Sequence, residues 1–187
     1  MKKLIVYSVF ILAFIERVWF DFGPNIELIT LATILSAFYL DRKTTLLLTL
    51  AVVAGSDILI GNSNIFIFTW SGFILPILAI NIFKNLIAKL NLKTNNILSG
   101  TLAGVSSNIF FFLWTNLGVW ALDSWGMYPN TALGLLQSYI NSLPFLKYQL
   151  TSTLFFVPIG FLIYEVIFNN LHLHRTKITI SHMEAIE

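Results

Sequence analysis

Cysteine is absent from this chain of 187 residues, and charged side chains are scarce. Without a thiol, the sequence excludes disulfides, thiolate catalysis and cysteine-based zinc sites. Charged residues make up 11% of the chain, against about 25% in a typical soluble domain. The net charge of +2 is too small to indicate a nucleic-acid partner. These shortages place the chain among membrane proteins.

Several motifs of known chemistry are also missing. The sequence contains no P-loop, HExxH, GxSxG or glycine-rich dinucleotide turn. The histidines His172, His174 and His182 all lie near the C-terminus, so the apolar segments contain no histidine that could serve as a general base. A solvated tail is a better interpretation of His172 and His174 than a metal site. The sequence therefore predicts no cofactor and no enzyme activity.

Long apolar segments dominate instead, and 57% of the residues are hydrophobic. A helix needs ~20 mostly apolar residues to span a bilayer. The first apolar run resembles a signal peptide, but Glu16 and Arg17 stand where a cleavage site would be, so we interpret it as an uncleaved span. The pattern predicts an all-α polytopic protein, a six-helix transmembrane bundle in one domain (1–170) with a loose polar tail (171–187). The predicted spans cover residues 4–20, 26–40, 46–60, 65–83, 97–122 and 149–168.

Basic residues orient this bundle in the bilayer. With the N-terminus inside, only Arg17 and Lys147 belong to the outer side. The inner loops and tails hold Lys2, Lys3, Arg42, Lys43, Lys84, Lys89, Lys93, Arg175 and Lys177. The positive-inside rule therefore predicts a multi-pass protein of the cell (inner, cytoplasmic) membrane with both termini cytoplasmic.

Residues 131–143 have the period of an amphipathic helix. The segment is too short and too polar to span, and Pro144 is expected to end it. We therefore expect an extra helix on the outer surface, lying over the bundle as a candidate lid. Its apolar face holds Leu133, Leu136, Ile140 and Leu143, and its polar face holds Gly134, Gln137, Ser138, Asn141 and Ser142.

Polar and aromatic residues gather at the outer ends of the predicted spans. Solvation is the preferred interpretation of Asp21 and Asp123, and an interfacial belt that of Trp19 and Trp125. Arg17 lies ~20 Å into a core of ~30 Å, where an ionisable group is normally paired or lines a wet cavity. Its natural partners are Asp57 and Glu27, as a structural ion pair or as part of a ligand site.

An outer pocket with aromatic walls and a few convergent polar groups is what a small solute needs. Tryptophan rings would stack on a flat ligand. The outer side has more acids than bases, which favours a cationic or zwitterionic ligand. The predicted solute-binding residues are Arg17, Asn25, Glu27, Asp57, Trp70, Trp114, Asn116 and Trp120.

Three blocks of the sequence resemble a known family. They are residues 17–37, the segment AVVAGSDILIG (51–61), and residues 106–145 with SSNIFFFLWTNLGVW and YPNTALGLLQSYINSLPF. The blocks resemble an uncharacterised family of bacterial six-span integral membrane proteins. That family is itself similar to the substrate-binding S components of energy-coupling factor (ECF) transporters.

The resemblance implies a six-helix bundle that captures a small vitamin-like solute from the outer side. A coupling protein with two ATPase subunits would then drive uptake. Many S components carry AxxxA spacing on the first helix for docking that protein, whereas the first span here has only Ala13. This departure leaves open a different docking mode or action without a coupling module.

Two other classes of function remain as alternatives. One is a membrane-embedded enzyme that uses outer carboxylates such as Glu16 and Glu27 for acid–base work. The other is a structural or assembly subunit whose polar outer half binds another protein. The solute-binding hypothesis takes the lead because the polar and aromatic residues gather at one end of the predicted bundle.

Overall fold

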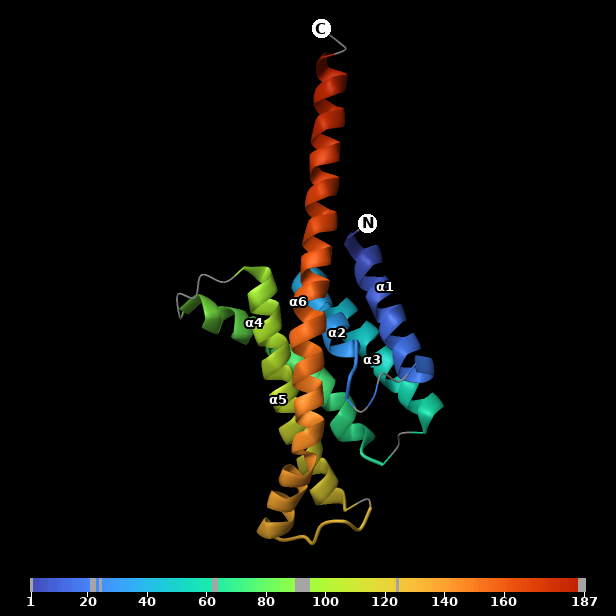
Figure 1. Cartoon of the computed structure of the whole chain (residues 1–187), viewed down its shortest axis with the longest axis vertical. Coiled ribbons are helices and arrows are strands. Elements are labelled where there is room, and N and C mark those ends of the chain that lie inside the picture. The colour runs from blue at the N-terminus through green and yellow to red at the C-terminus, as the bar shows by residue number, and fades with distance from the viewer. Residues whose placement is uncertain are drawn as a thin grey trace.

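The computed structural model describes residues 2–20, 23, 25–61, 64–89, 95–123 and 125–184, with side chains from residue 3 to residue 167. Asp21, Lys93 and the side chains of the predicted tail lie outside the described part. Across the described residues every regular element is helical, which confirms the predicted all-α class (Figure 1). The elements are α1 (Lys2–Ile15), the π-helical segment η1 (Glu16–Phe20), α2 (Ile29–Tyr39), α3 (Arg42–Ile60), α4 (Phe66–Lys89), α5 (Asn96–Leu122) and α6 (Ala132–Glu184).

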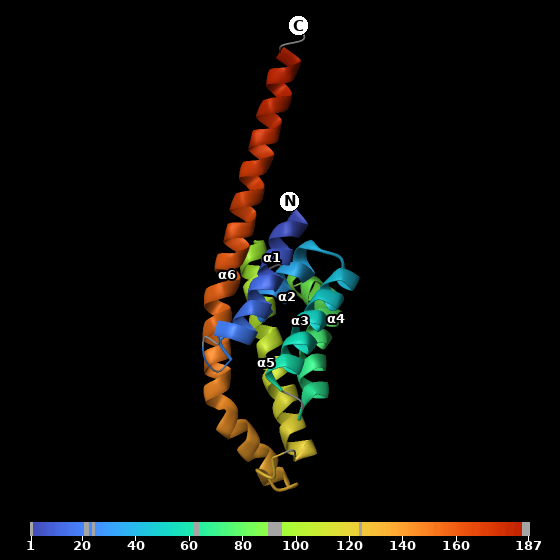
Figure 2. The same ribbon diagram turned by 90° about the vertical axis from the view of Figure 1, so that its right-hand side faces the viewer.

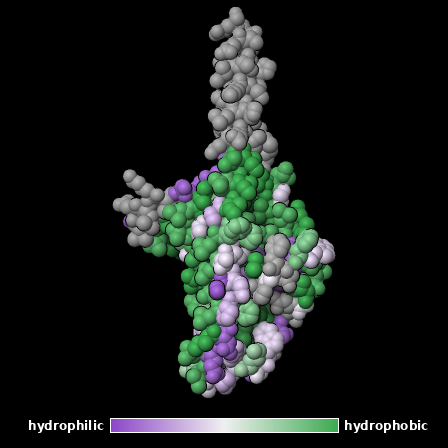
Figure 3. Space-filling view, in the orientation of Figure 1, coloured by the Kyte–Doolittle hydropathy of each residue, from purple (hydrophilic) through white to green (hydrophobic). Residues whose placement is uncertain are grey.

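Both chain termini lie at the same end of the bundle, which we call the terminal end (Figures 1 and 2). The C-terminal part of α6 projects beyond it. The polar tail predicted to be loose is therefore helical as far as Glu184. Figure 3 shows a mainly hydrophobic surface, with hydrophilic residues gathered in a strip toward the opposite end.

Four of the described helices are long and apolar enough to cross a membrane: α3, α4, α5 and residues 132–167 of α6. By length and composition this is a multi-pass membrane protein. Six full spans are not confirmed, because α2 has 11 residues. At 1.5 Å per residue its length is about 16 Å, roughly half of a bilayer core.

Helix α2 is the centre of the bundle and contacts α1, α3, α4, α5 and α6. Every residue from Ile29 to Ser36 is buried. Hydroxyl pairs join this helix to α3, with Thr33 bound to Thr49 over 3.2 Å and Ser36 to Thr45 over 2.8 Å. Lipid offers no hydrophobic drive for helix association, so such polar contacts and close packing hold the helices together.

Two glycines set the close approach of α5 to α6. A Cβ on Gly100 would lie 2.4 Å from Cζ of Phe161, and one on Gly104 would lie 2.9 Å from Cγ2 of Thr153. This glycine pair therefore packs within the chain, as GxxxG spacing allows in membrane helices.

The amphipathic segment 131–143 differs from its prediction, because it is not a separate helix that stops at Pro144. Pro144 does not end a helix, because α6 continues through it without a break. The segment also presents its apolar face outward, since Leu133, Leu136, Ile140 and Leu143 are exposed, while Ser138 is fully buried. The segment therefore forms the start of α6 and is not a separate surface helix.

Candidate functional site

Arg17 joins three elements near the middle of the bundle. Its Nε donates to Oγ of Ser56 over 2.9 Å, and its Nη2 donates to Oδ1 of Asp57 over 2.9 Å. Its Nη1 lies 2.8 Å from Oε2 of Glu27. The Arg17 side chain is only 7% exposed. The predicted pairing of Arg17 with Asp57 and Glu27 is therefore present, with both carboxylates engaged at once.

The local backbone explains how adjacent residues Glu16 and Arg17 both reach the interior. They open the π-helical turn η1, which is wider than an α-helical turn and is often found at functional sites. Glu16 is buried, and its Oε2 accepts a hydrogen bond from the backbone N–H of Leu28 over 3.3 Å. The side chain of Glu16 thus fixes the segment that leads into α2 against η1.

Asp57 lies behind Arg17 and is 1% exposed. Its Oδ1 accepts from Arg17, and its Oδ2 accepts from Nε1 of Trp70 over 2.9 Å. A buried carboxylate needs such partners, because an uncompensated charge in an apolar surrounding is very costly. We therefore assign Asp57 and Trp70 the role of holding Arg17 in place from α3 and α4.

Glu27 is the more accessible carboxylate, with 27% of its side chain exposed. It lies in the non-helical segment before α2, and its backbone N–H donates to Oγ of Ser152 on α6 over 3.2 Å. Asn25 in the same segment has a left-handed φ of 59°, which asparagine tolerates better than most residues. Irregular backbone at membrane depth is stable where it is buried in protein or lines a cavity.

A cavity of about 340 Å³ opens in front of Arg17 and Glu27. Its size lies within the range of about 300–1,000 Å³ that is common for small-molecule sites. Four phenylalanines and three aliphatic side chains provide apolar contact, and the polar groups are mostly neutral. Its lining residues are Arg17, Asn25, Glu27, Ile65, Thr69, Phe73, Phe111, Phe112, Thr115, Asn116, Val119, Ser142, Phe145, Leu146 and Gln149.

Asn116 is held in a fixed orientation on the cavity wall. Its Nδ2 donates to the carbonyl oxygen of Phe112 over 2.8 Å, and its Oδ1 accepts from the hydroxyl of Ser142. Ser138 donates to the backbone carbonyl of Asn116 over 3.1 Å. The first turns of α6 are thereby fastened to α5 beside the cavity.

The structure divides the eight predicted site residues into three groups. Arg17, Asn25, Glu27 and Asn116 line the cavity, whereas Asp57 and Trp70 support Arg17 from behind. Trp114 and Trp120 are not among the lining residues. The Nε1 of Trp114 donates to Ser71 over 2.8 Å, and the Nε1 of Trp120 donates to the carbonyls of Pro129 and Thr131. The aromatic walls expected from tryptophan are provided by phenylalanine.

Helical periodicity would have indicated the wall that the sequence analysis missed. Thr115, Asn116 and Val119 lie three, four and seven residues after Phe112, so the four residues share one face of α5. Trp114 is two residues from Asn116 and therefore belongs to the opposite face. A face-by-face analysis around Asn116 would have selected Phe112 and rejected Trp114.

No group of three or more His, Asp or Glu side chains in the described part of the chain could hold a metal ion. The cavity wall therefore offers two opposite charges, Arg17 and Glu27, together with neutral hydrogen-bonding groups and phenyl rings. Such a wall can bind and orient a small solute that carries both polar and apolar parts.

Comparison with known proteins places the chain in a family. No curated protein and no solved structure matches it. A family model, described as a family of unknown function (DUF6580), matches residues 1–176. Because the match covers nearly the whole sequence, the chain belongs to the DUF6580 family.

Proposed function

We propose that this protein binds a small solute in the cavity beside Arg17 and Glu27 and takes part in its uptake across the membrane. The observation that carries the proposal is the cavity itself, whose wall combines a charge pair, amides, hydroxyls and phenyl rings. This combination is typical of sites that recognise a polar molecule with a flat or apolar part.

The backbone around the cavity supports a transport role. Asn25 and Glu27 come from a non-helical segment that precedes a short buried helix, α2. In many membrane transporters the solute site lies near the middle of the bilayer, where helices are discontinuous. In the proposed topology, α1 and η1 together cross the membrane once. The short helix α2 and the non-helical segment before it together make the second crossing. The protein then passes the membrane six times, with both termini cytoplasmic and the cavity open to the outside.

The charges on the wall favour a cationic or zwitterionic solute. Glu27 is more exposed than Arg17, so the more accessible charge is negative. An amino group on the solute would contact Glu27, and its polar atoms would contact Asn116 and Gln149. The rings of Phe111, Phe112 and Phe145 would cover its apolar part.

The resemblance to ECF S components fits this proposal and adds a coupling protein with ATPase subunits as candidate partners. The alternative of an enzyme that uses Glu16 and Glu27 has less support. Oε2 of Glu16 accepts from the backbone of Leu28, and Oε2 of Glu27 faces Arg17. Both contacts are structural. In neither of them does a carboxylate face its counterpart across the position of a reacting group. The assembly-subunit alternative does not account for a cavity of this size and chemistry.

Native mass spectrometry of protein gently extracted from its own membrane tests the proposal. We expect a discrete small-molecule adduct that is lost in Glu27→Gln. Asp123→Asn is the matched control, because it makes the same change at an exposed carboxylate away from the cavity wall. An adduct that persists in Glu27→Gln, or no adduct in the parent protein, would contradict solute capture at this cavity.

A further inference from the structure

We propose that Phe73 and Phe111 form a gate beneath the solute cavity, so that the solute leaves through the bundle toward the terminal end. The inference rests on the proposed solute-binding function. It adds a route and identifies the side chains that close it. The route runs along the seam between α4 and α5.

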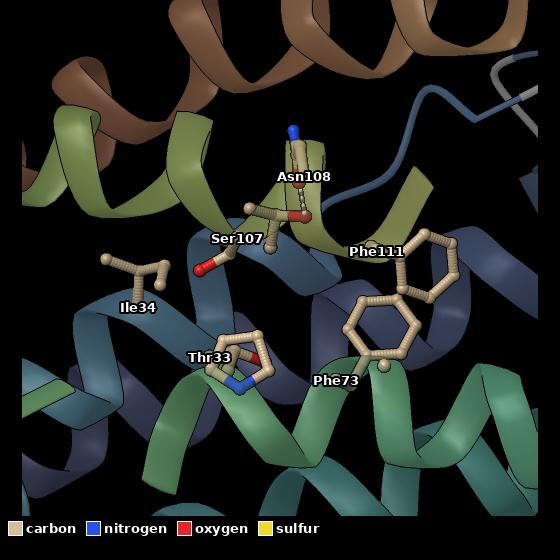
Figure 4. Close-up of a pocket in the computed structure, with 9 residues that line it drawn as sticks. Thr33, Ile34, Phe73, Ser107, Asn108 and Phe111 are labelled. Carbon is tan, nitrogen blue, oxygen red and sulfur yellow. Dashed lines mark hydrogen bonds between the residues drawn. The ribbon is translucent and has the colours of Figure 1, made fainter. Parts of the chain in front are cut away.

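Three hollow spaces follow one another along this seam. The solute cavity shares Phe73 and Phe111 with a much smaller cavity of about 10 Å³ (Figure 4). The small cavity shares Pro76 and Ser107 with a groove of about 390 Å³. That groove lies between the halves of α4 and α5 that are nearer the terminal end, and Ala79 is part of its wall. The shared residues place the small cavity between the two larger spaces.

The two phenyl rings are in contact where the solute cavity meets the small one. Their centroids lie 4.7 Å apart with the planes inclined by 48°. Phe73 is 8% exposed, and Phe111 is partly buried and packs against the hydrophobic core. Aromatic rings in contact at this distance leave no passage between them, so the route is closed in this conformation.

Glycine allows the Phe111 ring to lie directly against α4. A Cβ on Gly72 would lie 2.8 Å from Cδ2 of Phe111, closer than side chains approach one another. The Phe111 ring can therefore occupy this position only because Gly72 has no side chain.

Proline gives α4 a weak point one helical turn farther on. Pro76 has no N–H, so it cannot donate to the carbonyl of Gly72 in the manner of an α-helix. Bending is easiest at such positions. A bend at Pro76 would move the part of α4 that carries Phe73 relative to Phe111 on α5.

The small cavity is too small and too apolar to hold the solute in this conformation. Thr30, Thr33, Ser107 and Asn108 belong to its wall, but nearly all of the surface that the cavity exposes is apolar. The Ser107 hydroxyl donates to the carbonyl of Ala103, one turn earlier on α5, over 2.8 Å, and Figure 4 shows Ser107 beside Ile34 and Thr33. A volume of about 10 Å³ is close to the minimum for one water molecule. The solute can therefore pass only when the gate residues separate.

Single-cysteine labelling tests the gate directly, because the natural chain contains no cysteine. Thr115→Cys reports on the solute cavity, and Ser107→Cys reports on the space beyond the gate. Intact cells receive a cationic, membrane-impermeant thiol reagent from outside. We expect Thr115→Cys to react and Ser107→Cys to react very slowly.

Removing one gate ring should open the path. We expect Phe111→Ala to speed the labelling of Ser107→Cys by about tenfold or more, since a tenfold rate change requires only ~1.4 kcal/mol of barrier. Phe110→Ala is the matched control, because Phe110 is the adjacent residue and lines the groove but not the two cavities. It should leave the labelling rate of Ser107→Cys unchanged.

The labelling of Thr115→Cys in the Phe111→Ala background checks that the fold is kept. If that rate changes, Phe111→Leu replaces Phe111→Ala, because leucine keeps more of the buried volume. Fast labelling of Ser107→Cys with Phe111 present would overturn the gate. So would equal acceleration by Phe110→Ala, or no acceleration by either alanine or leucine at position 111.

The same variants separate this inference from the proposed function. A solute adduct in the mass spectrum without faster Ser107→Cys labelling would retain solute binding and reject the gate. Faster labelling without an adduct would retain the gate and reject solute capture. Failure of Thr115→Cys to react from outside would reject the outward-facing cavity, and the gate with it.

Discussion

The guanidinium of Arg17 donates to the carboxylate of Asp57 over 2.9 Å, although 40 residues separate them in the chain. The pair connects the π-helical turn at the end of α1 to the last turn of α3. Both side chains are almost completely buried. Each is therefore held where lone charges are least tolerated, and the stability of the bundle depends on their remaining together.

Replacing both members of this pair should destabilise the protein less than the sum of the two single losses would suggest. Arg17→Met should lower the free energy of unfolding by about 3–5 kcal/mol, because Asp57 is then left buried without its cation. Asp57→Asn should also destabilise the protein, because Arg17 loses a charged partner. The double variant should lose less than the sum of the two, with a coupling of about 0.5–3 kcal/mol. Denaturant titration in detergent micelles, followed by tryptophan fluorescence, measures the cycle. Strictly additive losses would contradict an energetic link.

Phenylalanine, and not tryptophan, should determine affinity for the solute. Phe112→Ala should weaken binding by about tenfold or more, which corresponds to ~1.4 kcal/mol, because the ring lines the cavity. Trp114→Ala should leave affinity unchanged, although it removes the hydrogen bond to Ser71. Calorimetric titration with the solute identified by mass spectrometry compares the two variants. The reverse order of effects would restore the tryptophan-based site expected from the sequence.

Asn108 should be an important contributor to the stability of the helix bundle. Its Nδ2 donates to the carbonyl of Gln149 and to Thr153, and its Oδ1 accepts from Thr30. Asn108→Ala should lower the free energy of unfolding by about 1–3 kcal/mol, because three helices lose a shared connection. Ser106→Ala, at an exposed position on the same helix, should change it little. Equal losses in both variants would show that the network contributes nothing.

Acid should weaken the start of α3 through Asp41, which lies outside the spanning part of the helix. Hydrogen bonds from the Thr44 hydroxyl (2.6 Å) and N–H (2.9 Å) hold the pKa of Asp41 below its usual value of 3.8. A lowered pKa in the folded state means that the stabilisation is complete above pH 3.8 and is lost as the pH falls further through the folded value.

The pH dependence of the melting temperature checks this prediction. The parent protein should lose more stability below pH 3.8 than Asp41→Asn, in which the cap does not titrate. At neutral pH the two should melt at similar temperatures, because asparagine is also a good N-cap. Parallel pH profiles for the two proteins would contradict the assignment of Asp41 as a titrating cap.

Periodicity and length predicted most helix positions well. The predicted span at 97–122 became α5 at Asn96–Leu122, and that at 65–83 became the first part of α4. Long apolar runs have few other stable forms in a bilayer, because every backbone polar group must be bonded within the chain. The second span was the exception. Its first residues include Glu27, which stays outside α2 and lines the cavity together with the preceding Asn25.

The segment 131–143 shows what a hydrophobic pattern leaves open. Its two faces were recognised from the sequence, but the direction in which each face points was not. Ser138 is buried against α5 and Leu133 is exposed. The hydrophobic pattern alone does not say whether water or hydrocarbon surrounds a helix. The interior contacts made by Ser138 and Ser142 settle the direction.

By itself, the sequence determined that this protein is helical and membrane-embedded, and that Arg17 requires buried carboxylate partners, because a scarce charge in an apolar chain must be compensated. Only the tertiary structure decided that Glu27 and Asp57 bind Arg17 together, and that Phe112 replaces Trp114 on the cavity wall. The physical reason is that cavities and buried pairs are made by residues distant in the chain. Their meeting depends on how α1, α3, α5 and α6 pack around α2.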